Sequence, residues 1–285
     1  MPAGLAVREP EADGAAAALA WAGDLPALRE PTGEDELFVL EHRGHPAATV
    51  LGLAFRLWAP PSPAGDPAAE AGLPECPAPW GRLPAVCAGA IALQVRRDWL
   101  GDLVRTDAAC GSPRCGQRVD IAFSIADYLD HHRPRAFRGA TPEPGGTGWL
   151  ALSGTEVRFR IPTLSDLLAA LAAADPDETL AHRCVRPDRV PAALARRVDR
   201  ALAALAPSPA GDVTGRCPEC GQPMALRFDP VSYALAELRD AAAGVHEHVW
   251  LLASAFGWRE REILRMPRRR RAIYADLAER DRRGW

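Results

Sequence analysis

Lysine and asparagine are absent from this chain, so all 34 of its basic side chains are arginine. Alanine is abundant at the neutral positions, a composition typical of proteins encoded by GC-rich genes. Because lysine is missing altogether, a high arginine content does not by itself indicate recognition of phosphate or nucleic acid. The formal net charge is -3, which excludes a strong overall attraction to polyanions.

Long apolar runs are also missing. No run reaches the roughly 18 residues of a membrane-spanning helix, so we expect no membrane span. The first residues, MPAGLAVREPEADG, carry acids where a secretory signal needs a basic start. We therefore expect a cytoplasmic protein. Its length of 285 residues and hydrophobic content of 48% suit one large globular domain or two modest ones.

The sequence lacks the common catalytic motifs. HEH at 246–248 is not the HExxH of a zinc hydrolase, and GGTG at 145–148 lacks the spacing of a dinucleotide-binding loop. One hypothesis is nevertheless an enzyme that uses His131, His132 or His182 beside a metal. No nucleophile, base and orienting group line up around these histidines, so we predict a protein without catalytic activity.

What the sequence does contain is an internal repeat centred on cysteine. CGQRVDIAFSIADY, which begins at Cys115, returns as CGQPMALRFDPVSY, which begins at Cys220. A further cysteine stands just upstream in each copy, Cys110 in the first and Cys217 in the second. Paired cysteines of this kind are knuckles that together hold a tetrahedral Zn²⁺. The sequence therefore predicts a structural zinc site with the ligands Cys110, Cys115, Cys217 and Cys220.

Each copy also predicts the same local structure. Gly116 and Gly221 follow the second cysteine, where a positive φ turns backbone amides toward a thiolate. Alternating apolar residues then predict a strand with one buried face. Ser124 and Asp229 stand where a helix cap belongs. Each unit is thus predicted as a knuckle, a strand and a helix start.

Disulfides and inert buried thiols account less well for these four cysteines. A disulfide framework needs an oxidising compartment, and inert thiols do not explain paired spacing on both sides of a duplication. For the remaining cysteines a packing role is the better hypothesis. Cys76 and Cys87 are too far apart for a knuckle, and Cys184 stands alone, so we predict structural thiols there.

The predicted fold class is α+β, mainly helical, with a small zinc-ribbon-like β element built from the two knuckles. Residues 1–36 are acidic and rich in alanine, and we expect them to be disordered or loosely ordered. A mainly helical domain is expected over 37–285, with knuckles at 110–123 and 217–228. Residues 60–81 are rich in proline and predict a surface linker.

Hydrophobic periodicity predicts helices before and after each knuckle, and a strand in the segment between the two knuckles. The strand is expected within 156–161, where apolar and charged residues alternate until Pro162. Thr163 or Ser165 is expected to cap the helix that follows it. Helices are expected as two short segments within 37–57 that divide near Pro46, and at 163–174, 191–205 and 230–256. Residues 83–105 are expected as one helix or as two that break near Trp99.

The C-terminal segment from Arg259 is basic, with ten arginines against five acids. Gly257 is expected to end the preceding helix, and Pro267 to open the last one. One hypothesis is a helix-turn-helix-like tail that grips DNA through Arg268 to Arg271. We favour an amphipathic helix with a solvated basic face, because four consecutive arginines point all around a helix. Its buried residues would be Ile263, Leu264, Ile273, Tyr274 and Leu277.

Three segments in this order resemble a known family: GRLPAVCAGAIALQVRRDWLGDLVRTDAACGSPRCGQ, EVRFRIPTLSDLLAALAAADPDETLAHRCV and CPECGQPMALRFDPVSYALAELRDAAAGVHEHVWLLASAFGWREREILRMPRRRRAIYADL. The chain resembles, from residue 37 to its end, the zinc-knuckle proteins found with contractile phage tail-like particles. Those are similar to baseplate hub and assembly components of contractile-tailed phages. The resemblance implies a structural or assembly component whose partners are baseplate and hub proteins. The alternative is a zinc-ribbon DNA-binding regulator that uses the arginine-rich C-terminal helices.

Overall fold

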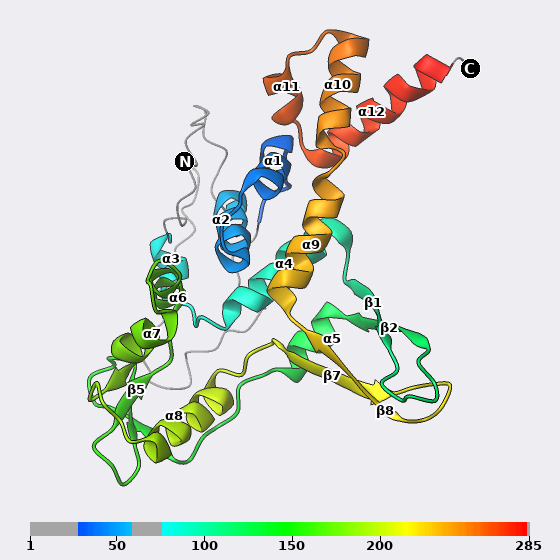
Figure 1. The fold of residues 1–285 in the computed structure, drawn as a ribbon. Coiled ribbons are helices and arrows are strands. Elements are labelled where there is room, and N and C mark those ends of the chain that lie inside the picture. Colours follow the sequence, from blue (N-terminus) through cyan, green and yellow to red (C-terminus); the bar gives the residue numbers. More distant parts are fainter. Residues whose placement is uncertain (1–27, 59–75, 284–285) are drawn as a thin grey trace, which may run out of the picture.

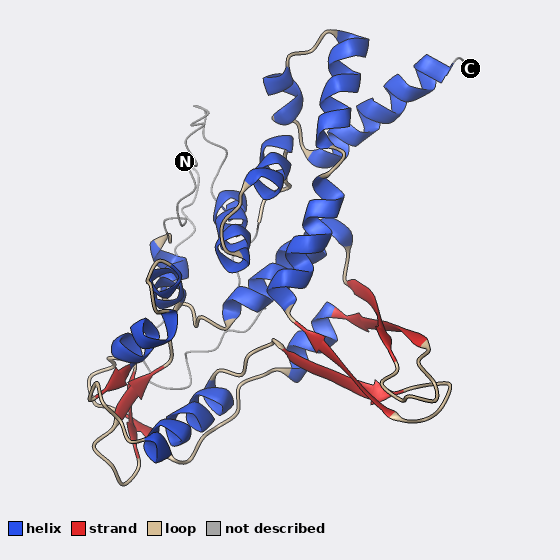
Figure 2. Cartoon of the chain, in the orientation of Figure 1, coloured by secondary structure: helices blue, strands red, loops and turns tan. Residues whose placement is uncertain are grey.

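The computed structural model describes residues 28–58 and 76–283. The fold is α+β and mainly helical, as predicted, and its strands form small antiparallel sheets (Figure 2). In the described ranges, no helix combines the length and the apolar character needed to cross a bilayer.

Ordered structure begins earlier than the predicted boundary at residue 37. Helix α1 spans Gly33–Glu41, and Thr32 forms a capping box with Asp35 at its start. Residues 28–36 therefore belong to the folded domain, because ion pairs with arginines bury Asp35 and Glu36. Residues 1–27 of the predicted loose segment lie outside the described residues.

Helix α2, Pro46–Trp58, begins at the proline that the sequence marks as a division. Most of the predicted linker at 60–81 lies outside the described residues, but its end is not a linker. Helix α3, Ala78–Gly81, places the Trp80 ring in the core, where it meets Phe55 edge-on at 5.3 Å between ring centroids.

The main core is formed where α4, Cys87–Leu100, packs against α2 and α9, Pro230–Ala242. Within the segment 83–105, helix α4 begins later than predicted and ends close to the alternative break near Trp99, and no second helix follows it. Gly101 adopts φ 93 and ends α4, and the chain continues as strand β1, Leu103–Ala109. Val104 is the buried residue of β1 and packs in a second core cluster with Leu93 of α4.

The repeat appears in the structure as two antiparallel β-hairpins, each with a cysteine loop at its tip. In the first, β1 pairs with β2, Arg118–Ser124, and α5, Ile125–His131, follows. In the second, β7, Gly211–Arg216, pairs with β8, Pro223–Phe228, and α9 follows. The strand before each knuckle was not predicted. The predicted caps are confirmed: Ser124 accepts from the Asp127 amide and Asp229 from the Val231 amide.

The chain segment between the two hairpins forms a smaller lobe, at the lower left of Figure 1. Its sheet has the order β3-β4-β5-β6, and β5 lies within the predicted alternating strand at 156–161. Thr163 caps α6 as predicted, although α6 ends at Leu171 rather than at 174. The strands are Ala140–Pro142, Trp149–Leu152, Arg158–Arg160 and Val185–Arg186, and the helices are α6 Leu164–Leu171, α7 Pro176–Cys184 and α8 Ala192–Leu205.

The predicted long helix at 230–256 is two helices, because the chain breaks at Ala243 and Gly244 between α9 and α10, Val245–Phe256. Gly257, with φ 68, ends α10 as predicted. Two further helices follow, α11 Glu260–Leu264 and α12 Arg268–Arg283.

The buried face of α12 differs from the prediction. Ile263 and Leu264 in α11 are buried as expected, but Ile273 and Leu277 are exposed. Helix α12 instead turns Arg271, Ala275 and Ala278 inward, since Arg271 forms an ion pair with Glu36 of α1.

Candidate metal centre

The two cysteine loops close with the same backbone hydrogen bonds. The amide of Cys110 donates to the Gln117 carbonyl over 2.8 Å, and the amide of Cys217 donates to the Gln222 carbonyl over 2.9 Å. Each bond joins the first cysteine of a knuckle to the residue that precedes the outgoing strand. The two loops therefore close in the same way.

The first loop is two residues longer than the second, 110–117 against 217–222. SPRCGQ in the first copy aligns with CPECGQ in the second, so Ser112 takes the place of the first cysteine and Cys110 lies two residues upstream. The backbone preserves this equivalence. The amide of Gly116 donates to the Ser112 carbonyl, as the amide of Gly221 does to the Cys217 carbonyl.

The glycines at these tips adopt the predicted conformation. Gly116 has φ 60 and Gly221 has φ 71, in the left-handed region that side chains disfavour. This turn directs the following amides back to the sulfurs: the Gln117 amide bonds Cys115 and the Gln222 amide bonds Cys220.

The four predicted ligands converge, and their sulfur atoms all lie within 4.8 Å of one another. The closest approaches join one cysteine of each unit: Cys110 Sγ is 3.6 Å from Cys220 Sγ, and Cys115 Sγ is 3.9 Å from Cys217 Sγ. A tetrahedron with metal–sulfur bonds of about 2.3 Å has sulfur–sulfur edges of about 3.8 Å. The four thiols are free, and these separations fit a shared ion rather than disulfides of about 2.05 Å.

The thiols differ in acidity. The Cys220 amide, together with that of Glu219, donates to the Cys217 sulfur and lowers the pKa of Cys217 to about 7. The amides of Gln117 and Gln222 act in the same direction on Cys115 and Cys220, but burial and the neighbouring thiols raise the pKa of both above the ordinary value. Binding a metal ion would release the protons of these thiols.

An aromatic cluster at the ends of the hairpins opposite the cysteine loops joins the two units, and sequence reasoning did not assign it a role. Phe123 and Phe228 pack edge-on at 5.2 Å between centroids, and Tyr128 and Tyr233 each contact Phe228. The Tyr128 hydroxyl donates to the Pro209 carbonyl, next to the second hairpin, and the Tyr233 hydroxyl donates to the Arg105 carbonyl in the first. The signal was present, because Phe and Tyr recur in both copies of the repeat.

The other cysteines lie elsewhere, as predicted. Cys87 is buried in α4, where burial raises the pKa of its thiol to about 12. Cys184 is buried beside Asp166, with its sulfur 3.8 Å from a carboxylate oxygen, and burial raises its pKa to about 11. Burial also raises the pKa of Cys76, which packs at the edge of the main core. Each is a packing residue outside the group of convergent thiols.

The three histidines that sequence reasoning considered do not join the thiols within the described part of the chain. His132 caps the C-terminus of α5 and packs on the Tyr128 ring, and His131 lies beside it. His182 lies within 3.6 Å of the carboxylates of Glu178 and Asp188 in the smaller lobe.

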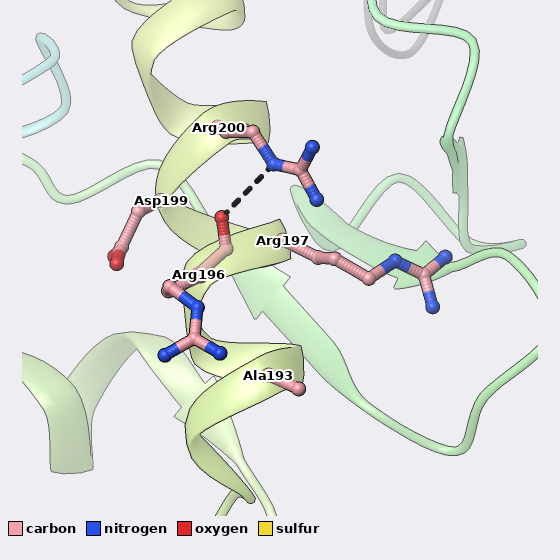
Figure 3. A pocket seen from close by; sticks show the side chains of 5 residues that line it. All are labelled: Ala193, Arg196, Arg197, Asp199 and Arg200. Carbon is pink, nitrogen blue, oxygen red and sulfur yellow. Dashed lines mark hydrogen bonds between the residues drawn. The ribbon is translucent and has the colours of Figure 1, made fainter.

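An open hollow of about 690 Å³ lies along α8. Its lining comes from one helix and is mainly arginine (Figure 3). Arg197 donates to the Ser153 carbonyl, and the Arg200 Nε donates to the Arg196 carbonyl, so two of the guanidinium groups are held by backbone. Asp199 is the one carboxylate among the residues that line this hollow.

No known protein family, curated protein or solved structure matches the chain. Four convergent thiols with backbone N–H donors form a donor set for a soft or borderline divalent cation. When four sulfurs complete a tetrahedron, no coordination position remains for water or substrate.

Proposed function

We propose that the protein is a structural or assembly component of a phage-tail-like contractile injection system, in its baseplate and hub region, and that a structural Zn²⁺ stabilises it. The observation that carries the metal assignment is the convergence of Cys110, Cys115, Cys217 and Cys220 from two hairpins. The setting is supported by the resemblance of the chain from residue 37 onward to zinc-knuckle proteins of such particles.

Zinc is the ion that best suits this donor set. Thiolates favour Zn²⁺ over Mg²⁺ and Ca²⁺, which prefer oxygen ligands. Zinc also adopts tetrahedral geometry in structural sites, which agrees with the sulfur separations of 3.6 and 3.9 Å. A four-thiolate site is closed, so we assign the ion a role in stability and none in catalysis.

The ion would link two segments that are far apart in sequence, and in this sense it would act as a metal clasp. Cys115 and Cys217 are 102 positions apart, and the chain between them includes the four-stranded sheet and α6 to α8. A disulfide closing a loop of about 100 residues contributes about 4.7 kcal/mol in the chain-entropy description. We expect a metal clasp of similar span to contribute at least about that much.

Elemental analysis of purified protein tests the metal. We expect one zinc per chain, and we expect a chelator to lower Tm by at least about 10 °C, since 1 kcal/mol shifts Tm by about 2–4 °C in a domain of this size. The pair Cys110→Ser and Cys217→Ser should lose the metal, whereas Cys76→Ser should keep it. Protein without zinc whose Tm ignores chelator contradicts the assignment.

The assembly role has a separate test. Particles from a deletion strain should lack a normal baseplate or fail to assemble, and electron microscopy would show this directly. Complementation with the wild-type gene should restore them, while the Cys110→Ser/Cys217→Ser gene should not. Ordinary particles from the deletion strain would rule out the assembly role without bearing on the zinc site.

A zinc-ribbon DNA-binding regulator remains the second candidate, favoured by exposed arginines on α12. Weighing against it, Arg268 and Arg271 both bond Glu36 and are held by the fold. A gel-shift titration at two salt concentrations separates the candidates. DNA binding would weaken by about one log unit per log unit of salt for each phosphate contact.

A further inference from the structure

The outward face of α12 carries two exposed aliphatic side chains. Ile273 is 60% exposed and Leu277 is 48% exposed. They stand one helical turn apart and therefore lie on the same face. The opposite face of the helix, with Arg271, Ala275 and Ala278, is buried, so Ile273 and Leu277 point away from the rest of the protein.

Arginines border this pair. Arg269, Arg270 and Arg280 are exposed, and at 3.6 residues per turn they fall on either side of Ile273 and Leu277. Their side chains form no ion pair with the described part of the chain, in contrast to Arg268 and Arg271. We call Arg269, Arg270, Ile273, Leu277 and Arg280 the α12 stripe. The acids of this helix lie outside the stripe, at its edges or beyond them.

The α12 stripe belongs to a unit formed by α10, α11 and α12, which is attached to the domain and projects from it. Leu251 and Leu252 of α10, Ile263 of α11 and Ala275 of α12 share one small core. In Figure 1, α12 runs away from the body toward the C-terminus. Among the seven exposed large apolar side chains of the described residues, four belong to this unit: Trp250, Phe256, Ile273 and Leu277. The surface therefore offers apolar contact area on a preformed helix.

We infer that the α12 stripe is a docking surface for an acidic amphipathic polypeptide segment. The stripe is positive and contains no acid, so a partner with apolar residues between Asp or Glu side chains would complement it in both charge and hydrophobicity. The inference names the kind of partner that the proposed assembly role would engage, and it takes only its biological setting from that role.

Nucleic acid and membrane suit the stripe less well. Aliphatic side chains occupy its centre, where a helix that reads nucleic acid needs groups that donate or accept hydrogen bonds. Two aliphatic residues are few for binding a bilayer surface, and Asp276 and Asp281 at the edges would repel anionic headgroups.

Selection from a displayed library of random peptides tests the inference with the full-length protein. We expect the enriched peptides to carry Asp or Glu around apolar residues at helical spacing. In fluorescence anisotropy, Ile273→Gln/Leu277→Gln and Arg269→Glu/Arg270→Glu should each weaken binding of a selected peptide at least about thirtyfold, the scale of an interface hot spot. Arg196→Glu/Arg200→Glu on α8 makes the same charge change and should leave binding unaltered.

Because Ile273, Leu277, Arg269 and Arg270 are all exposed, both stripe variants should keep the wild-type Tm, which distinguishes lost contact from lost folding. Enriched peptides without acidic residues, or selected peptides that bind both stripe variants as wild type does, would overturn the inference. So would a wild-type protein that binds duplex DNA or phosphatidylserine vesicles through the stripe and enriches no peptide. Particle morphology does not enter this test, so it can fail while the assembly role stands.

Discussion

Arg271 is buried completely and forms an ion pair with Glu36, although 235 positions separate the two residues. Arg268 adds a second bond to the same carboxylate at 3.0 Å. The close approach of α1 to α11 and α12 depends on Gly33, where a Cβ would come within 2.7 Å of Arg271 Nη1 and 2.9 Å of the Leu264 Cα. The start of α1 and the last two helices are therefore one packed unit, held by a buried charge pair.

Removing one partner of this pair should be costly. Glu36→Ala leaves the Arg271 charge buried and unpaired, and we expect the free energy of unfolding to fall by about 3–5 kcal/mol in urea denaturation. Glu34→Ala is the matched control, because Glu34 meets Arg265 at an exposed site and should cost less than about 1 kcal/mol. Replacing both partners, Glu36→Leu with Arg271→Met, should recover most of the loss. If Glu36→Ala and Glu34→Ala lowered the free energy of unfolding equally, the stabilising role of the buried ion pair would be contradicted.

The aromatic cluster predicts a second sensitive position. Phe228 is buried and contacts Phe123, Tyr128 and Tyr233, so Phe228→Ala removes the contact that both repeat units share. We expect a loss of about 3–5 kcal/mol by urea denaturation, from lost burial and the cavity left behind. Phe256→Ala, at an exposed ring, should cost less than about 1 kcal/mol. A mild effect at Phe228 would mean that the hairpins are held together mainly by the cysteine site.

The cysteine site could be predicted from sequence because its signals are local. Spacing within each knuckle, the glycines after Cys115 and Cys220, and the recurrence of both patterns all lie within short windows. Nothing in those windows says where the sulfurs meet, but a duplication with half a ligand set in each copy leaves few other arrangements. The helix caps Ser124 and Asp229 were predictable for the same reason.

The errors arose where distant contacts decide the structure. DWLGDLVRTD continues a helical pattern, yet Gly101 turns the chain at φ 93 and β1 pairs with a strand beyond the cysteine loop. Counting apolar residues placed Ile273 inside, but the ion pair of Arg271 with Glu36 sets the rotation of α12. A partner 235 positions away leaves no mark in a local window.

The glycines at the knuckle tips give a third prediction. Gly221→Ala forces a side chain into the left-handed region at φ 71, and we expect a loss of about 1–2 kcal/mol in thermal or urea unfolding. Zinc affinity, measured by competition with a chromophoric chelator, should fall as well, because the turn aims the Gln222 amide at Cys220. Gly215→Ala in β7 is the control, as it has open space and no positive φ. If Gly221→Ala and Gly215→Ala had similar effects on stability and zinc affinity, the positive φ at the knuckle tip would have no special role.

Asp166 connects α6 to its surroundings through several donors. Arg160 approaches its carboxylate with two nitrogens at 2.5 and 2.9 Å, and Arg183 Nε donates over 2.7 Å. The amide of Thr163 donates over 2.9 Å in the capping box. Burial raises the pKa of Asp166, but the bonds from Arg160, Thr163 and Arg183 outweigh it and hold the pKa well below its usual range.

This lowered pKa makes part of the stability depend on pH. In the unfolded chain Asp166 titrates near its ordinary value of 3.8, and in the folded protein it titrates lower, so the unfolded state binds the proton first as pH falls. The contribution of Asp166 is therefore complete above about pH 5 and is lost progressively as pH falls through 3.8 toward the folded-state pKa.

Asp166→Asn should cost about 2–3 kcal/mol at neutral pH, because Arg160 and Arg183 lose their charged acceptor. In urea denaturation from pH 7 to pH 3 the gap between wild type and Asp166→Asn should narrow, while the exposed control Asp177→Asn should follow wild type throughout. A gap that stays constant over this range would show that Asp166 stabilises the fold through hydrogen bonding alone, without the charge.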